Sequence, residues 1–367
     1  LWQSISEDIC ESRGFDLKTF NAHVNNLSAT EAKEMVEAGF ADGLMTRDEM
    51  TAELTGLFGV EDEKDVKMIT LDNYAKAVVK PNVKATDKIA VVYANGQIVD
   101  GNNDGLSSEK YSQIISEVRK DSTIKAVLLR VDSPGGSVVA SEIIRKEIEL
   151  LRNEKPVVVS YGNYAASGGY WISNECDKIF TNETTLTGSI GVFSMVPNFE
   201  KIIKEKARIN IVNINSNEHS DLMTLTKPLD KEEIAYMQKS VENIYDSFLS
   251  IVANGRDMTT EEVDKIAQGR VWSGTDAMKI GLTDEIGTVA DALQYTVNIS
   301  GLEEYRLVEY PKAKTQMEKI MESFGQAEST MDKLSNPDIA VEDMIRELKE
   351  MSKMVYARME YDYTFNN

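Results

Sequence analysis

Short apolar runs and longer amphipathic stretches alternate along most of the chain. Apolar runs typical of buried strands occupy residues 88–93, 126–131, 156–160, 178–181 and 305–310. Stretches with helical spacing occupy residues 107–121, 138–153 and 164–174. In the second of these, one face of the predicted helix carries Ile143, Ile144, Ile148 and Leu151. Alternating strands and helices predict an α/β fold with a largely parallel sheet and flanking helices.

The first eighty residues resemble a later part of the same chain. Residues 39–42 (GFAD) match residues 281–284 (GLTD), and each follows a helix–turn–helix pattern with a turn at Asp16 or Asp257. The spacing from turn to glycine agrees within one residue, and a short strand is expected after each aspartate. We interpret this as a duplicated domain, whose first copy contributes only its last third. Chance similarity between two helical hairpins is the alternative.

Three regions are therefore expected. Residues 1–80 form the helical end of the first repeat with a linker, residues 81–310 form the complete repeat, and residues 311–367 form a helical extension. In the extension Ile345, Leu348, Met351 and Val355 have helical spacing, and methionines recur. This pattern predicts a helix packed on the main domain or on a neighbouring subunit. Methionine-rich surfaces also bind peptides, which is the alternative.

Composition narrows the class of protein. Of 367 residues, 42% are hydrophobic and 28% charged, which is typical of a globular chain. The net charge of −21 excludes a general nucleic-acid or anionic-lipid binder, because phosphate contacts need clustered Lys and Arg. Two cysteines leave the redox compartment open. The absence of an apolar run of bilayer length predicts no membrane span. The start at Leu1, without Met or a signal pattern, is expected of a piece of a longer polypeptide.

Three motifs after predicted strands carry candidate chemistry. Residues 132–137 (DSPGGS) form a glycine turn whose N–H groups can face an oxyanion, or simply a tight turn. Residues 165–171 (AASGGYW) place Ser167 among small neighbours, as a nucleophile or as a helix N-cap. Residues 184–192 (TTLTGSIGV) form an extended edge for substrate pairing, or an ordinary strand with a bulge.

Other chemistries are disfavoured. The Ser167 motif is not the G-x-S-x-G elbow of α/β-hydrolases. No His/Cys cluster has metal-ligand spacing, and no phosphate-binding loop is present. We therefore expect neither a metal nor a cofactor.

Four segments together resemble the signal peptide peptidase A (protease IV) family in its long, two-repeat form. They are DSPGGS, AASGGYWIS, TLTGSIGV and GRVWSGTDAMKIGLTDEIG, in that order. The resemblance implies a crotonase/Clp-protease-like fold and a bacterial serine protease that degrades released signal peptides. It also implies a homotetramer anchored in the inner membrane, with the catalytic domain outside the cytosol, although this piece itself would be soluble.

The resemblance also assigns roles to residues. Ser167 corresponds to the nucleophile, and Gly168 with Gly135 or Gly136 corresponds to the oxyanion hole. The general base of the family is a Lys with a lowered pKa. Short members carry it at the position of Ser220 here, whereas long members carry it in the first repeat. We therefore expect the base to lie upstream of Leu1 and the isolated chain to be inactive.

Several alternatives remain open. His219 and Lys227 are the other candidates for the base, while Lys155 and Lys178 are expected at solvated strand ends. Apolar peptides would bind a groove for which we suggest the lining residues Val138, Leu186, Ile190 and Val192, each of which would otherwise pack in the core. A crotonase-type acyl-CoA enzyme and a non-catalytic peptide-binding module are the competing functions.

Overall fold

The structure is a computed structural model that describes residues 1–71, 73–74, 84–103, 105–312 and 355–358. The chain divides into two compact units, Leu1–Val83 and Lys84–Asn367. Each unit is described by itself. Within the described ranges, no helix combines the length and the apolar character that crossing a bilayer requires.

Every regular element described in the first unit is a helix or a helical turn. Its elements are α1 (Trp2–Arg13), α2 (Leu17–Asn25), α3 (Ala32–Glu37), α4 (Arg47–Phe58) and the short turn η1 (Glu63–Asp65). Side chains of Asp16 and Thr46 cap α2 and α4. The rings of Phe15, Phe20 and Phe40 pack together between the helices. The short strand expected after Asp42 is wrong, since residues 43–46 are described and form no strand.

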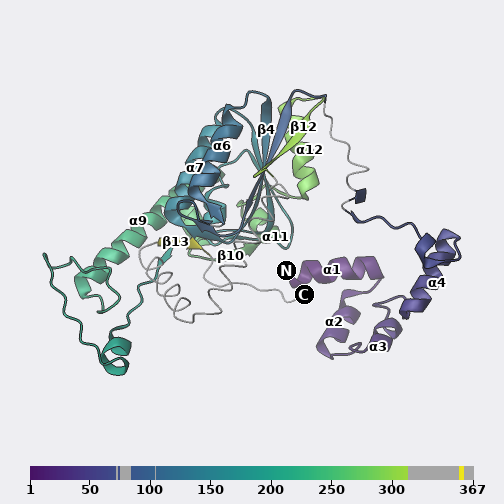
Figure 1. The fold of residues 1–367 in the computed structure, drawn as a ribbon, viewed down its shortest axis with the longest axis horizontal. Helices are drawn as coiled ribbons and strands as arrows, with labels where there is room; N and C mark the ends of the chain where they lie inside the picture. Colours follow the sequence, from purple (N-terminus) through teal and green to yellow (C-terminus); the bar gives the residue numbers. More distant parts are fainter. Residues whose placement is uncertain (72, 75–83, 104, 313–354, 359–367) are drawn as a thin grey trace. The chain divides into compact units, whose positions relative to one another are not determined.

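The second unit is built on an eight-stranded sheet (Figure 1). Its strands are β1 (Lys88–Asn95), β4 (Ile124–Ser133), β6 (Val157–Ala166), β7 (Lys178–Thr181), β8 (Leu186–Gly188), β10 (Val271–Ser273), β11 (Glu285–Ile286) and β12 (Arg306–Tyr310). The main path runs β10-β8-β6-β4-β1-β12, and β7 pairs with β6 and β11. All these pairs are parallel except β10 with β8. The mixed α/β fold with a mostly parallel sheet is therefore confirmed.

Helices cover both faces of this sheet. The helices of the unit are α6 (Ser108–Lys120), α7 (Val138–Arg152), α8 (Gly168–Trp171), α9 (Lys231–Arg256), α10 (Thr260–Ile266), α11 (Gly274–Lys279) and α12 (Val289–Ser300), with a π-type turn at Ile202–Lys206. Helices α6 and α7 lie on one side of β4 and α12 lies on the other (Figure 1). Burying both faces explains why the strands read as continuous apolar runs.

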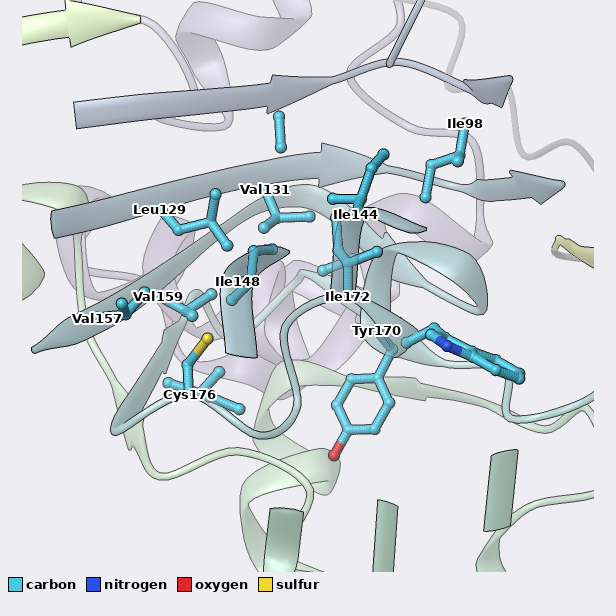
Figure 2. Close-up of a cluster of buried hydrophobic side chains, with 14 of the residues drawn as sticks. Ile98, Leu129, Val131, Ile144, Ile148, Val157, Val159, Tyr170, Ile172 and Cys176 are labelled. Atoms are coloured by element: carbon cyan, nitrogen blue, oxygen red, sulfur yellow. The ribbon is translucent and has the colours of Figure 1, made fainter. Parts of the chain in front are cut away.

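Neighbouring residues of a strand serve different cores because side chains alternate across the sheet. Leu129 and Val159 belong to the larger cluster, together with Ile144 and Ile148 of α7 (Figure 2). Leu128 and Val158, one position earlier in each strand, belong to the smaller cluster with Ala292 of α12. The large cluster lies directly below the ends of β4 and β6, where the motifs of interest begin.

A second, smaller sheet crosses the ends of the first. It runs β3 (Leu106–Ser107), β2 (Ile98–Val99), β5 (Gly135–Ser137), β13 (Val355–Arg358) and β9 (Phe193–Ser194), in that order. It joins the glycine turn after β4 to a strand from near the end of the chain. The predicted C-terminal helix is wrong at Val355, which begins a strand, and its other residues lie outside the described part.

Two further expectations are corrected. The helix predicted over 164–174 is limited to α8, because β6 continues through Gly162 and Asn163 to Ala166. Those two residues are typical of loops, but they belong to β6, and the residues that follow them, Tyr164 to Ala166, pair with β8. Ile143 was expected on the buried face of α7, yet it is exposed, whereas Ile144, Ile148 and Leu151 are buried.

An arginine fork recurs in the two units. Arg13 Nε donates to the Gly39 carbonyl at 3.1 Å, and its guanidinium pairs with Asp42 at 3.0 Å. Arg256 Nε donates to the Gly281 carbonyl at 2.9 Å, and its guanidinium pairs with Asp284 at 2.6 Å. Each arginine ends a helix three residues before the N-cap of the next helix. The shared fork supports the duplication, which remains a prediction.

Candidate active site

Ser167 lies at the sharp turn between β6 and α8. Its φ of 52° and ψ of −113° are rare for a residue with a side chain. The N–H of Ser167 donates to the Gly188 carbonyl at 2.8 Å, which fixes the turn against β8. The side chain makes no cap hydrogen bond to α8. Instead Oγ donates to the Gly191 carbonyl at 3.3 Å, so the hydroxyl is not serving as an N-cap.

The DSPGGS turn packs directly on this serine turn. A Cβ atom on Gly135 would lie 2.6 Å from the Gly168 nitrogen and 3.0 Å from the Ala166 carbonyl oxygen. Gly135 also has a φ of +99°, so glycine is needed there both for space and for conformation. The fold thus brings together the first two motifs of the sequence.

The three predicted glycines differ in how their backbone is engaged. The N–H of Gly135 donates to Ser133 Oγ at 3.2 Å within the turn. Gly136 lies in β5, where it pairs with Ile98 of β2 and with Ala357 of β13. Gly168 is the first residue of α8, and the first N–H groups of a helix have no partner within it. None of the three carries a side chain that would keep a ligand from the backbone.

The third motif contains β8, the strand that pairs with β6 next to the serine turn. Strand β8 pairs with β6 on one side and with β10 on the other. The expectation that residues 184–192 form an open edge is therefore wrong for β8. Ser189 follows with a φ of 46°, and its N–H donates to the Arg270 carbonyl at 2.8 Å. Strands β5 and β9 are also paired, each with β13.

A pocket of about 390 Å³ opens beside the serine turn. Its lining residues are Ser189, Gly191, Val192, Phe193, Tyr245, Gln268 and Gly269. Gly191 is also the acceptor of the Ser167 hydroxyl. Burial and a hydrogen bond to Asp264 raise the pKa of Tyr245 to about 12, so its hydroxyl is neutral at physiological pH. Sequence reasoning missed Tyr245 and Phe193, which belong to no motif.

The four predicted groove residues separate in the structure. Val192 lines this pocket, whereas Ile190 is fully buried in the large core cluster. Val138 is the first residue of α7, and Leu186 pairs with Tyr164 in the sheet. Both Val138 and Leu186 are buried. Val192 is the member of this set whose position fits contact with a ligand.

The candidate bases within the chain are engaged elsewhere. Lys155 precedes β6 and Ser167 follows it, so they lie at opposite ends of that strand, and Lys155 Nζ donates to the Val118 and Asp121 carbonyls. Lys178, at the start of β7, pairs with Glu285. Both lysines do lie at strand ends as expected, but they are bonded rather than free in solvent.

Lys227 and His219 lie in one acidic cluster. Hydrogen bonds to Asp221 and then Glu233 raise the pKa of Lys227, which favours the charged ammonium and disfavours a base. His219 lies 3.5 Å from Glu233 and 3.7 Å from Asp230. Ser220, at the family's lysine position, is exposed and donates to the Asn217 carbonyl.

An ionic brace holds the helix that follows Ser167. Trp171 Nε1 donates to Glu142 of α7 at 2.9 Å. Arg145 binds the same carboxylate at 2.8 Å and also binds Glu175. Burial opposes ionisation of Glu142, but the Arg145 and Trp171 hydrogen bonds outweigh it and lower the pKa of Glu142. The brace ties α8 to α7 and so limits movement of the serine turn.

Comparison with known proteins identifies the family of the chain. The family model described as Peptidase family S49 matches residues 149–302, which include Ser167. Protease 4 of Haemophilus influenzae is 36% identical over 305 residues, covering 80% of this chain but 49% of that protein. A protein of Methanocaldococcus jannaschii is 36% identical over 232 residues, covering 61% of this chain and 74% of its own. The chain belongs to peptidase family S49.

The chain spans about half the length of Protease 4 of Haemophilus influenzae. Among solved structures, a ClpP1 mutant from Listeria monocytogenes matches 55% of this chain and 94% of its own, with 19% identity and a TM-score of 0.38.

Proposed function

We propose that this chain carries the nucleophile and oxyanion hole of a serine peptidase whose general base is a lysine outside residues 1–367. The observation that carries the proposal is the convergence of the Ser167 turn, the Gly135 turn and the loop after β8. Membership of peptidase family S49 supports the same activity. The glycines leave their backbone uncovered by side chains, next to a serine whose backbone is held by packing in a rare conformation.

The reaction follows from these groups. Ser167 Oγ attacks the carbonyl carbon of a peptide bond and transfers its proton to a neutral amine. The oxyanion that forms accepts hydrogen bonds from the N–H group of Gly168 and from that of Gly135 or Gly136. The amine then protonates the leaving nitrogen, and water hydrolyses the acyl ester by the same steps in reverse order. The pocket beside Gly191 would accept a side chain of the substrate.

A lysine base requires a dry site. Its amine is neutral at physiological pH only where burial lowers its pKa. The four candidate side chains within the chain are bonded to other groups. An external lysine directed at Ser167 would enter such a site, because Ser167 itself is fully buried.

Apolar peptides are the proposed substrates, with released signal peptides as the biological source. Strands β5 and β9, which pair with β13 in the structure, would offer backbone edges to an extended peptide in its place, and Val192 and Phe193 would offer apolar contacts. The family resemblance also suggests membrane anchoring and a homotetramer, and both remain proposals. An acyl-CoA enzyme would use the same glycine donors but would not need Ser167.

The test compares full-length wild-type protein with Ser167→Ala. We expect hydrolysis of a fluorogenic apolar peptide to fall at least about 10³-fold, and covalent labelling by a fluorophosphonate to disappear. Ser220→Ala, at an exposed hydroxyl, is the control and should retain both. Full hydrolysis by Ser167→Ala contradicts the proposal. Coenzyme A binding without peptide hydrolysis would favour the acyl-CoA alternative.

A further inference from the structure

Strands β4 and β6 lose their common register just before the two turns of the site. The ladder pairs Val131 with Tyr161, and its next pair is Ser133 with Ala165. Three residues of β6, at positions 162–164, therefore lie opposite a single residue of β4. We call these three residues the β6 bulge. Bulges change the direction of a strand and are common next to active sites, where they direct a side chain.

Side chains of β4 bind the backbone on both sides of this bulge. Asp132, the residue opposite it, accepts a hydrogen bond at Oδ1 from the Tyr164 N–H at 3.0 Å. Arg130 Nη1 donates to the carbonyl of Tyr161, the last residue of β6 before the bulge. Buried backbone groups that leave a ladder need such partners, because an unpaired one is costly.

Gly162, the first residue of the bulge, lies directly against the Asp132 carboxyl group. A Cβ atom on Gly162 would lie 2.7 Å from Asp132 Cγ. Gly162 does not have a positive φ, so the space beside Asp132 is what requires glycine here. The Gly162 carbonyl accepts a hydrogen bond from the buried Thr185 hydroxyl at 2.7 Å. The bulge is thus held by side chains from both neighbouring segments.

The bulge determines which part of β6 lies beside the Gly135 turn. Without it, Ser133 would pair with residue 163 in place of Ala165. Ser167 would then lie two residues further along the sheet, a displacement of about 7 Å at the rise of a strand. The close packing of the Gly135 turn on the serine turn therefore depends on the two extra residues of β6.

We propose that Asp132 is a positioning residue of the peptidase, which holds the β6 bulge and so places Ser167 beside the Gly135 turn. This rests on the proposed function. Asp132 acts through the backbone of Tyr164 rather than on the substrate. The donor is a neutral amide, so the bond needs an acceptor oxygen at this position and not a negative charge.

Steady-state hydrolysis of a fluorogenic apolar peptide by the full-length protein tests this role. We expect Asp132→Ala to lower kcat about 10²-fold, the cost of a nucleophile displaced by about 1 Å. KM should stay close to the wild-type value, because the pocket beside Gly191 is unchanged. Asp132→Asn should keep most of the wild-type kcat, since an amide oxygen accepts the same bond.

A matched control removes a carboxylate elsewhere in the same unit. Asp246 is exposed on α9, and Asp246→Ala should leave kcat and KM unchanged. A wild-type kcat in Asp132→Ala would overturn the inference. A loss in Asp132→Asn as large as that in Asp132→Ala would also overturn it, because the charge would then be what matters.

Thr185→Val keeps the test decisive if Asp132→Ala does not fold. Valine has the shape of threonine but cannot donate to the Gly162 carbonyl, so kcat should fall with KM unchanged, and Thr185→Ser should restore it. A wild-type kcat in Thr185→Val, in a protein that hydrolyses the peptide through Ser167, overturns this inference while the proposed function stands. A wild-type protein without Ser167-dependent hydrolysis overturns both.

Discussion

At the scale of single residues, the site depends on backbone conformations that few residues adopt. Ser167 has a φ of 52° and Gly135 one of +99°. A non-glycine residue in such a region costs about 1–3 kcal/mol and persists only where its surroundings impose it. Here β6, β8 and the Gly135 turn impose it on Ser167. This backbone conformation places the hydroxyl at the end of β6, before α8 begins.

Gly168→Ala should remove activity without removing the serine. The added carbon would lie 2.7 Å from Ser141 Oγ and 3.1 Å from the Gly135 Cα, so the two turns must separate. We expect kcat/KM for an apolar peptide to fall about 10²-fold or more, as for loss of an oxyanion donor. The measurement is steady-state hydrolysis by the full-length protein.

A second glycine provides the control for that substitution. Gly56 lies in α4, and a Cβ atom there would meet nothing within 4 Å. Gly56→Ala should leave hydrolysis unchanged and, as a helix substitution, should not lower stability. Normal hydrolysis by Gly168→Ala, with the protein folded, would contradict the assigned donor.

At the scale of elements, sequence patterns predicted the strands that burial on both faces makes apolar and the helix face that the helical period determines. The apolar runs predicted β1, β4 and β7 because burial on both faces leaves an unbroken apolar segment. The spacing of Ile144, Ile148 and Leu151 predicted the buried face of α7, since the helical period fixes it. Motif chemistry indicated Ser167 and the glycine turn, and the structure brings those two turns together.

Elements defined by distant pairing could not be predicted in this way. Strand β13 reads as a helix because Met351 and Val355 have helical spacing, yet its partner residues Gly135 to Ser137 lie more than two hundred positions earlier. Tyr245 enters the pocket from α9 with no motif around it. Such contacts depend on the tertiary arrangement of segments, which a local period does not encode.

The two arginine forks should differ in strength. The Arg256 side chain is 8% exposed, and its removal leaves the Asp284 carboxylate without its charge partner. We expect Arg256→Ala to cost about 3 kcal/mol of unfolding free energy in the second unit. Asp42 is 91% exposed, so Arg13→Ala should cost the first unit much less.

Hydrogen exchange measured by mass spectrometry separates the two units. Arg256→Ala should speed exchange in α9, α10 and α11 while leaving α1 to α3 unchanged. Arg13→Ala should act only on α1 to α3, and weakly. An equal loss of protection in both variants would show that burial does not control how much each arginine fork contributes to stability.

At the scale of the whole molecule, the site is assembled from separate parts of the sequence. The Gly135 turn, the Ser167 turn, α9 and β13 all contribute, although they span most of the second unit. Lys155, Lys178, Lys227 and His219 are each paired with other groups, and we therefore place the proposed base in another segment. The chain's net charge of −21 would favour approach of a basic segment at low salt.

Residues 1–367 alone should therefore be folded but inactive. We expect no Ser167-dependent hydrolysis of an apolar peptide and little fluorophosphonate labelling, because a serine hydroxyl without a base is a weak nucleophile. Adding, as a separate polypeptide, the segment that precedes Leu1 in the full-length protein should restore both. The lysines of that segment are then replaced by methionine one at a time. We expect only one of these replacements to prevent restoration, because a single lysine serves as the base. Hydrolysis by residues 1–367 alone, abolished by Ser167→Ala, would show instead that the base lies within this chain.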